Sequence, residues 1–278
     1  MANAGIARYY DRLNRWNEIA RLVGYGGGRE RLTVHRALAD PAADGTPTTS
    51  RLHDVLTEHL PALQSPRVLD AGCGLGGTML MLAERYQARV TGLTLSASQA
   101  AAARAAIATA GFADALDVLV RSYDTPPAGP FDLVLALESL AHSPDPGVSV
   151  AALAGVLAPS GRFAVVDDMP EPSAADSADL QAFKRGWRSP VLWTRVDYLR
   201  AFNTHGLLLE HDLDLSPDVR PRTLGRIRLL EKLNRLAAAL PSPALREVMD
   251  SHMGGLALER MLRQRTMRYR MLMARRPS

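Results

Sequence analysis

The stretch of the sequence that is best suited to bind a ligand has three glycines that follow an acidic residue. Gly72, Gly74 and Gly77 have the spacing G-x-G-x-x-G, Asp70 precedes them, and helix-like residues 78–85 follow. Glycine permits a positive φ and lets a ligand approach the backbone, while N–H groups at a helix N-terminus carry partial positive charge. Because a short apolar run precedes the turn, the stretch has the strand–turn–helix context of a nucleotide-binding turn.

The next candidates follow the second apolar run of this region. Many nucleotide-binding sheets place an acidic residue at the end of the second strand, where it accepts from ribose hydroxyls. Thr94 stands there instead, followed by Leu95 and by Ser96-x-x-Gln99. Two roles stay open for Gln99: a ribose contact, or membership of a helix capping box. The missing acid argues against a nicotinamide-dependent dehydrogenase, which the glycine spacing alone would permit.

Two later apolar runs also end in groups that can move or attract protons. Glu138 and His142 follow the first run, and histidine is the usual base near neutral pH, so His142 is our candidate base. A buried structural histidine is the alternative. Asp167 and Asp168 follow the second run and could hold a cationic acceptor or organise the turn. No His or Cys stands beside them at ligand spacing, so we predict no metal site.

Trp187 and Trp193 flank Ser189-Pro190 in the segment after these acids. Two large aromatic side chains suit a lid over an apolar or cyclic acceptor. Packing of this segment onto the sheet is the alternative, because large aromatic side chains are usually buried.

Together these stretches resemble the class I S-adenosylmethionine-dependent methyltransferases. Residues 68–74 are similar to the first motif of that family, and residues 131–134 with 138–145 resemble its fourth-strand motif. Residues 92–96 resemble the branch that contains the tocopherol methyltransferases and the cyclopropane fatty acid synthases. The resemblance covers roughly residues 5–215, and its motifs are specific for the cofactor rather than for the acceptor.

The resemblance implies that S-adenosylmethionine binds at the glycine turn. Its amino-acid end would lie beside Asp70, and its adenine near residues 122–124, where Asp124 could instead only shape a turn. Tyr9 and Tyr10 match aromatic residues that line the methionine end in related enzymes, with core packing as the alternative. The expected cofactor contacts are Tyr9, Asp70, Gly72, Gly74, Thr94, Leu95, Gln99, Ser122, Tyr123 and Glu138. The expected catalytic residues are His142, Glu138 and Tyr10, and the expected substrate contacts are Asp168, Trp187 and Trp193.

Strands and helices that alternate along the chain must position these residues. Apolar spacing of three and four residues marks helices, and short apolar runs mark strands. Such alternation predicts a mostly parallel sheet built from right-handed βαβ units. The expected strands are 68–69, 89–95, 115–121, 131–137, 161–166, 207–213 and 267–274. The expected helices are 5–22, 30–38, 51–60, 78–85, 96–110, 148–158, 179–187, 194–203, 222–239 and 243–264.

We therefore expect an α/β fold, a doubly wound, mostly parallel seven-strand sheet of the Rossmann-like methyltransferase type. The expected division has four parts: an N-terminal helical lid at 1–62, a cofactor-binding core at 63–216, a helical cap at 217–264 and a final core strand at 265–278.

Composition limits the class of protein. The 278 residues are 47% hydrophobic and 22% charged, which is ordinary for a globular protein. Cys73 is the single cysteine, the N-terminus has no signal-peptide pattern, and no run reaches membrane-spanning length. We expect a reducing, cytoplasmic location, no membrane or nucleic-acid partner and a small-molecule substrate, with a homodimer left open.

Positive charge gathers at the C-terminal end. Residues 220–278 hold 14 Lys and Arg against 4 Asp and Glu, whereas residues 1–219 hold 19 against 25. Solvated helix faces explain such charge in most proteins. The alternative is a surface that attracts an acceptor with a carboxylate or phosphate.

The expected function is methyl transfer from S-adenosylmethionine to a small-molecule acceptor in specialised metabolism. A carbon acceptor comes first, because the branch that the motifs resemble includes carbon acceptors. Methylation of nitrogen or oxygen is the alternative. A nicotinamide-dependent oxidoreductase and a non-catalytic binding module are further alternatives from other classes.

Overall fold

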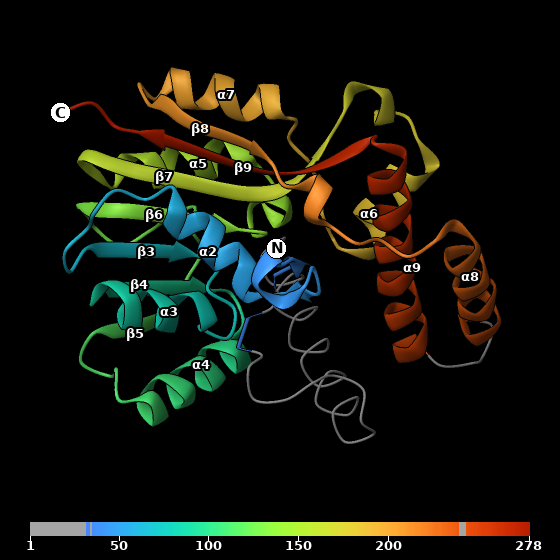
Figure 1. Ribbon diagram of the computed structural model, residues 1–278, viewed down its shortest axis with the longest axis horizontal. Helices are drawn as coiled ribbons and strands as arrows, with labels where there is room; N and C mark the ends of the chain where they lie inside the picture. Colours follow the sequence, from blue (N-terminus) through green and yellow to red (C-terminus); the bar gives the residue numbers. More distant parts are fainter. Residues whose placement is uncertain (1–31, 34, 239–242) are drawn as a thin grey trace.

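A seven-stranded sheet forms the centre of the computed structural model, which describes residues 32, 33, 35–238 and 243–278. The strand order is β5-β4-β3-β6-β7-β9-β8 (Figure 1). β9 is antiparallel to both of its neighbours, and the other strands run parallel to one another. This confirms the predicted mostly parallel α/β sheet. The strands are β3 (Arg67–Ala71), β4 (Arg89–Thr94), β5 (Leu116–Val120), β6 (Phe131–Leu137), β7 (Leu157–Pro170), β8 (Leu208–Asp214) and β9 (Met267–Arg275).

Helices cover both faces of the sheet, as the near-continuous apolar strands require. On one face lie α2 (Ser50–Glu58), α3 (Gly77–Tyr86) and α4 (Ala97–Ala110), and on the other lie α5 (Pro146–Gly155) and α7 (Arg195–Thr204) (Figure 1). Each layer of helices packs its own cluster of buried apolar side chains against the strands. The polar residues at the strand ends therefore lie between two layers of buried apolar side chains.

Three further helices stand beyond the carboxyl ends of the parallel strands. They are α6 (Ala178–Gly186), α8 (Leu224–Ala238) and α9 (Pro243–Gln264) (Figure 1). α6 and α9 approach each other closely at Gly186, which has no side chain. A Cβ added there would lie 2.4 Å from the carbonyl oxygen of Asp250. Arg260 of α9 forms ion pairs with Asp179 of α6 and Glu231 of α8. The predicted helices of the cap are present, while the four-part division of the chain stays a prediction.

The prediction fails at the second helix, expected at residues 30–38. Its described residues are not helical, and β1 (Leu38–Ala39) pairs with β2 (Pro47–Thr48) instead. Pro41 follows closely, and Asp40 caps a short 3-10 helix, Pro41–Ala43. The predicted helix at 5–22 lies outside the described residues.

Smaller differences concern where elements begin and end. α5 begins earlier than expected because Asp145 accepts from backbone N–H groups at its start and Pro146 occupies its first position. β7 is longer than the expected 161–166, because it pairs with β9 as far as Pro170. The remaining helices of the sheet layers lie within a few residues of the predicted ones. The other 3-10 helices are Leu140–His142, Pro172–Ala174 and Ser216–Asp218.

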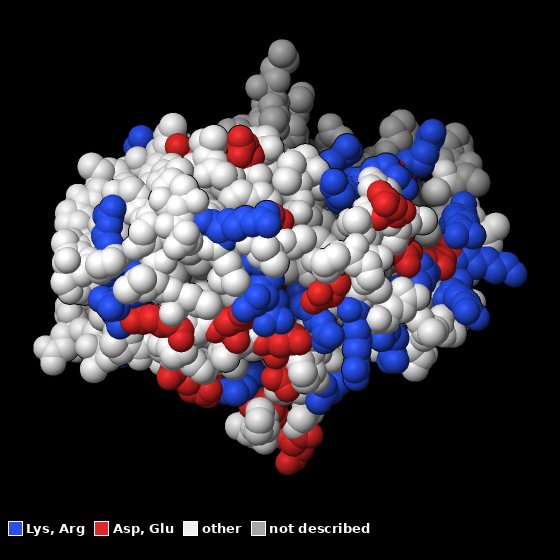
Figure 2. Space-filling model, turned by 90° about the horizontal axis from the view of Figure 1, so that it is seen from above, with Lys and Arg blue, Asp and Glu red and all other residues white. Residues whose placement is uncertain are grey.

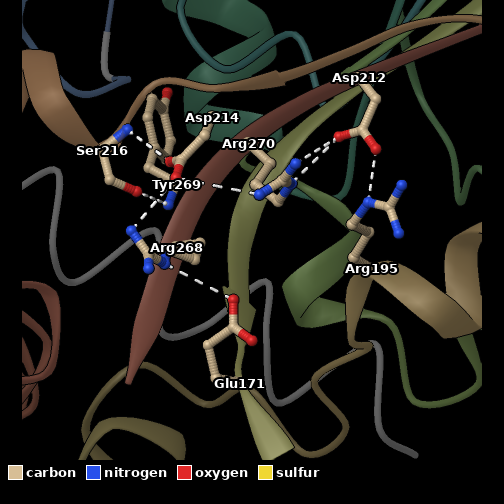
Figure 3. A network of polar contacts seen from close by, with 8 residues as sticks. All are labelled: Glu171, Arg195, Asp212, Asp214, Ser216, Arg268, Tyr269 and Arg270. Atoms are coloured by element: carbon tan, nitrogen blue, oxygen red, sulfur yellow. Dashed lines mark hydrogen bonds and ion pairs between the residues drawn. The ribbon is translucent and has the colours of Figure 1, made fainter. Parts of the chain in front are cut away.

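Several basic residues of the C-terminal segment form ion pairs within the protein. Arg268 of β9 contacts Asp214 at 3.2 Å and Glu171 at 3.6 Å, and Arg270 contacts Asp212 at 2.6 Å (Figure 3). Figure 2 shows Lys and Arg side chains gathered over the end that carries α8 and α9, with fewer Asp and Glu side chains among them. For these arginines of β9 the pairs favour a structural role over an anion-binding one.

Candidate functional site

The glycine turn follows the carboxyl end of β3 and contacts both β4 and Ser139, which follows β6. The N–H groups of Gly72 and Cys73 both donate to the carbonyl oxygen of Leu93, at 3.0 and 2.9 Å. Gly72 has φ +109°, and a Cβ added there would lie 2.4 Å from Cβ of Ser139. β4 and β6 flank β3 on opposite sides, so this is the point where the strand order reverses. Open α/β sheets bind their ligands at such a point.

Two buried polar atoms beside this turn have no hydrogen-bond partner among the described residues. They are Oδ2 of Asp70 and Oγ of Ser139. Burial raises the pKa of Asp70 to about 7. An unsatisfied buried carboxylate is costly unless a ligand donor reaches it. The turn therefore suits a ligand that brings a cationic or hydrogen-bond-donating group.

The start of α3 is closed by the chain that precedes the sheet. The N–H of Gly77 donates to the carbonyl oxygen of Leu32 at 3.2 Å. A Cβ at Gly77 would lie 2.4 Å from Oγ1 of Thr33. Because this helix N-terminus is already covered by protein, it is not a phosphate cradle of the kind that the glycine spacing also permits.

The predicted ribose contacts lie together at the end of β4. The Thr94 hydroxyl donates to the side-chain oxygen of Gln99 at 2.8 Å, and both residues are buried. Ser96 caps α4 by accepting from the Gln99 N–H at 3.1 Å. The Gln99 side chain thus contacts Thr94 and does not complete the capping box. Leu95 is half-buried between them.

The predicted adenine contacts follow β5. Tyr123 is buried, its hydroxyl donates to the carbonyl oxygen of Ser139 at 3.1 Å, and burial raises its pKa. The Ser122 hydroxyl donates to Asp124 at 3.0 Å, and Asp124 also accepts from Ser149 of α5. Tyr123 therefore links this loop to the residue that faces Gly72.

Four side chains converge near the carboxyl ends of β6 and β7 and the start of β9. Oε1 of Glu138 accepts from the Arg36 N–H at 2.8 Å and from the Tyr269 hydroxyl at 2.7 Å. The guanidinium of Arg36 donates to Oδ2 of Asp168 at 2.7 Å and stacks on the Tyr269 ring, 4.9 Å from its centroid. Glu138 itself has φ +51°, a left-handed conformation that is uncommon outside glycine. Strain at the end of a strand is typical of functional sites.

Sequence reasoning missed Arg36 and Tyr269. Arg36 was assigned to a helix that does not form, and Tyr269 sits in an apolar strand without any motif. They are joined to Glu138 across 102 and 131 positions of sequence. No local signal marks such a pair.

His142 ends the 3-10 helix Leu140–His142 and is buried. Burial lowers its pKa to about 4, despite hydrogen bonding to the backbone of Arg188 and Trp187. These contacts match the structural alternative, and the catalytic role of His142 stays a prediction. Tyr9 and Tyr10 lie outside the described residues.

The two tryptophans pack in different places, and the aromatic lid stays a prediction. Trp187 packs against Phe183 of α6 and donates to the carbonyl oxygen of Ser251 of α9 at 3.2 Å. Trp193 packs edge-on against Tyr198 of α7, in the apolar cluster of the opposite face. Packing of the insertion separates them, and their contact with substrate stays a prediction.

Sequence reasoning also missed a buried pair of histidines, His35 next to Arg36 and His53 of α2. Nε2 of His35 is 3.0 Å from Nε2 of His53, which is 3.1 Å from the Thr78 hydroxyl. Because Nδ1 of His35 faces the carbonyl oxygen of Arg36 at 3.2 Å, Nδ1 carries the proton and Nε2 accepts from His53. Burial lowers the pKa of both rings, that of His53 to about 3.

Neither a membrane-spanning helix nor a metal-binding cluster occurs among the described residues. None of the helices in the described ranges is long and apolar enough to cross a membrane. Within residues 32, 33, 35–238 and 243–278, no group of three or more His, Cys, Asp or Glu could hold a metal ion.

Comparisons with known proteins address the family. Residues 49–149 match the family model described as mycolic acid cyclopropane synthetase. The chain is 34% identical over 189 residues to 27-O-demethylrifamycin SV methyltransferase of Amycolatopsis mediterranei (strain S699), covering 66% of this chain and 68% of that protein. The chain belongs to the S-adenosylmethionine-dependent methyltransferases. It is thus an enzyme whose cofactor is S-adenosylmethionine, as the motifs predicted.

A second methyltransferase relative shares less of its length. The chain is 33% identical over 171 residues to tocopherol O-methyltransferase of Arabidopsis thaliana, covering 56% of this chain but 47% of that protein. The comparisons give no support for an oxidoreductase.

Solved structures share the fold of this methyltransferase. Geranyl diphosphate C-methyltransferase from Streptomyces coelicolor A3(2) aligns with a TM-score of 0.73 at 22% identity, covering 99% of this chain and 97% of that chain. The [4+2]-cyclase SpnF aligns with a TM-score of 0.75 at 21% identity, covering 98% and 95%. One fold therefore carries different reactions, and the acceptor must be argued from the site.

Proposed function

We propose that this methyltransferase transfers a methyl group to a hydroxyl oxygen of a small natural product. The carrying observation is the pair of carboxylates, Glu138 directly after β6 and Asp168 near the carboxyl end of β7, which both contact Arg36. A carboxylate can accept the proton that a hydroxyl must lose. The 34% identical relative is named for methylation at an oxygen, which supports the same choice.

A carbon acceptor, the first expectation from sequence, is the second candidate. The solved geranyl diphosphate C-methyltransferase structure favours it, although the 22% identity shows a shared fold alone. A carbon acceptor needs a base only where the carbon must lose a proton. Mass spectrometric fragmentation of the product distinguishes the two candidates.

The residues around the glycine turn fit the cofactor. Gly72 leaves no side chain between the turn and Ser139, and Asp70 offers an unsatisfied carboxylate oxygen to the cationic amino-acid end. Thr94 and Gln99 would hold the ribose, assisted by Leu95, and the loop after β5 would hold the adenine. The bound cofactor supplies an electrophilic methyl group on a sulfonium.

The test is incubation of the purified protein with isotope-labelled S-adenosylmethionine and a panel of hydroxylated natural products that includes 27-O-demethylrifamycin SV. We expect one member of the panel to gain a labelled methyl group on oxygen. Asp70→Asn should bind S-adenosylhomocysteine more weakly in calorimetry and serves as the binding control. Binding of S-adenosylhomocysteine without transfer to any hydroxyl acceptor would contradict the proposed acceptor class while leaving the cofactor assignment intact.

A further inference from the structure

We call the cluster of Arg36, Glu138, Asp168 and Tyr269 the acceptor edge. Its two carboxylates, Glu138 and Asp168, have different hydrogen-bond partners. Oε1 of Glu138 is occupied twice, by the Arg36 N–H at 2.8 Å and the Tyr269 hydroxyl at 2.7 Å. Asp168 has its Oδ2 on the Arg36 guanidinium at 2.7 Å, but its buried Oδ1 accepts no hydrogen bond from the described residues. A buried acceptor without a donor is uncommon and calls for a ligand or water. Oδ1 of Asp168 is thus an open acceptor position of the cluster, in which Nε of Arg36 is also buried without a partner among the described residues.

The neighbouring acid is directed elsewhere, because successive side chains of a strand point to opposite faces. Asp167 accepts from the N–H of Ala141 at 3.0 Å and from the Tyr198 hydroxyl of α7 at 3.4 Å. Asp168 instead shares its face with Tyr269, its partner in the β7–β9 register. Only Asp168 faces the segment that carries Arg36.

Arg36 holds Asp168 in a fixed orientation. One guanidinium lies between the carboxylate of Asp168 and the ring of Tyr269, and its own backbone N–H is anchored on Glu138. With both carboxylates ionised, the described cluster carries one cation against two anions. It therefore favours a ligand that donates a proton or carries positive charge.

We propose that Asp168 is the general base of this methyltransferase, accepting the acceptor's hydroxyl proton at Oδ1, and that Arg36 is its positioning residue. This inference rests on the proposed transfer to oxygen. It replaces His142 as the first candidate for the base.

The proton and electron balance is simple. The acceptor hydroxyl donates to Oδ1 of Asp168 before transfer. As the acceptor oxygen forms its bond to the methyl carbon, the carbon–sulfur bond breaks and its electron pair stays on sulfur. The hydroxyl proton passes to Oδ1 and is later released to water. The products are a neutral methyl ether, S-adenosylhomocysteine and one proton, which carries away the positive charge of the sulfonium.

The charges around Asp168 support this role. Burial raises its pKa to about 6, the cation of Arg36 opposes the rise, and the carboxylate of Glu138 adds to it. Asp168 is then ionised at neutral pH and more basic than an ordinary aspartate. Tyr269 keeps its proton, because burial raises its pKa well above the ordinary value. Burial, and after it the charge of Asp168, raise the pKa of Asp167 well above its ordinary value.

The decisive variant is Asp168→Asn, which keeps the size of the side chain and an oxygen for Arg36. With the hydroxyl acceptor identified in the panel, we expect the transfer rate at pH 7.5 to fall by about 100-fold or more. The wild-type rate should fall below a midpoint near pH 6, and this acid limb should be absent from the variant. Calorimetric affinity for S-adenosylhomocysteine should stay unchanged, which separates the base from the cofactor site.

Arg36 gives a signature that a structural role would not produce. Arg36→Met removes the cation that lowers the pKa of Asp168, so the acid limb should move to higher pH, while Arg36→Lys should keep it near its original position. Carbon-13 NMR of labelled aspartate, with the Asp168 signal assigned through Asp168→Asn, should show the same shift without any turnover.

Asp167→Asn is the matched control on the opposite face and should keep the acid limb. Near-full turnover of Asp168→Asn, or an NMR titration that keeps Asp168 protonated above pH 8 in the S-adenosylhomocysteine complex, overturns the proposal. A His142→Gln variant that loses the acid limb does so too. If no hydroxyl acceptor is methylated, both the proposed function and the assignment of Asp168 as the base are wrong. If a hydroxyl acceptor is methylated at a rate that does not depend on Asp168, only the assignment of the base is wrong.

Discussion

The hydroxyl of Tyr269 donates a 2.7 Å hydrogen bond to Oε1 of Glu138, although the two residues stand 131 positions apart. Tyr269 lies on β9, the strand that follows the cap helix α9. The last strand of the sheet therefore completes the acceptor edge that begins at β6. Any change that disturbs the packing of β9 should also reach Glu138.

Tyr269→Phe removes this donor and leaves Glu138 with the Arg36 N–H alone. We expect the free energy of unfolding to fall by about 1.5–3 kcal/mol, the usual net contribution of a hydrogen bond to a charged group. Urea denaturation measures it. Tyr198→Phe is the matched control: its hydroxyl reaches Asp167 at a longer 3.4 Å, so its loss should cost less. Equal losses of unfolding free energy in the two variants would contradict the expectation that the hydrogen bond to Glu138 contributes more than the one to Asp167.

Gly72→Ala tests the close approach of the turn to Ser139. The added Cβ would lie 2.4 Å from the Cβ of Ser139 at a positive φ, so backbone must shift where the cofactor binds. We expect calorimetric affinity for S-adenosylhomocysteine to fall at least tenfold and stability to fall by about 2–4 kcal/mol, from strain and overpacking together. Gly111→Ala is the control, because Gly111 also has positive φ but open space around it. It should lose stability without losing affinity.

The buried pair of His35 and His53 makes stability depend on pH. The pKa of His53 is about 3 in the folded protein, against an ordinary value of 6.5, so the unfolded chain binds more protons between these pH values. The stabilising contribution is therefore complete above pH 6.5 and is lost as pH falls toward 3. The slope is about 1.4 kcal/mol per pH unit for one such group.

His53→Gln should remove this slope. Buried acids with raised pKa values, Asp70 among them, act in the opposite direction over part of the same range, so the difference between wild type and variant is the quantity to measure. Urea denaturation from pH 7 to pH 4 should show that difference shrink steadily. A constant difference would contradict the assigned ionisation of His53.

Arg260→Gln tests whether the basic cap is structural. Arg260 joins α9 to Asp179 of α6 and Glu231 of α8. Its loss should destabilise the protein by about 1–3 kcal/mol, or several degrees in Tm, because two acids lose their partner. We expect the KM for the acceptor to stay unchanged. Arg228→Gln, at an exposed position of α8, is the control for charge alone. A raised KM in both variants would instead support an anionic acceptor drawn by the cap.

The glycine turn and the strand pattern were predictable because their causes are local. Apolar runs that alternate with amphipathic stretches mark parallel strands and their helices wherever they stand in a chain. The turn at Gly72 needs a positive φ that glycine supplies, and Ser96 and Gly111 bound α4 through their own conformations. These signals were enough for the seven-strand sheet and for the family.

The conformation around Arg36 and the packing of the two tryptophans could not be predicted from local sequence patterns. The segment around Arg36 was assigned to a helix, yet its conformation is fixed by contacts with Gly77, Glu138 and Asp168. Trp187 and Trp193 stand close in sequence, but they pack against different apolar clusters, which the sequence pattern does not show.

The sequence by itself determined the sheet, the glycine turn and the cofactor class, because short-range patterns encode them. The tertiary structure decided which charged groups meet at the acceptor edge. Arg36, Glu138, Asp168 and Tyr269 come from a loop and three strand ends, and their energies depend on burial and on charges brought from distant parts of the chain. Only folding places one arginine against two carboxylates and leaves Oδ1 of Asp168 open.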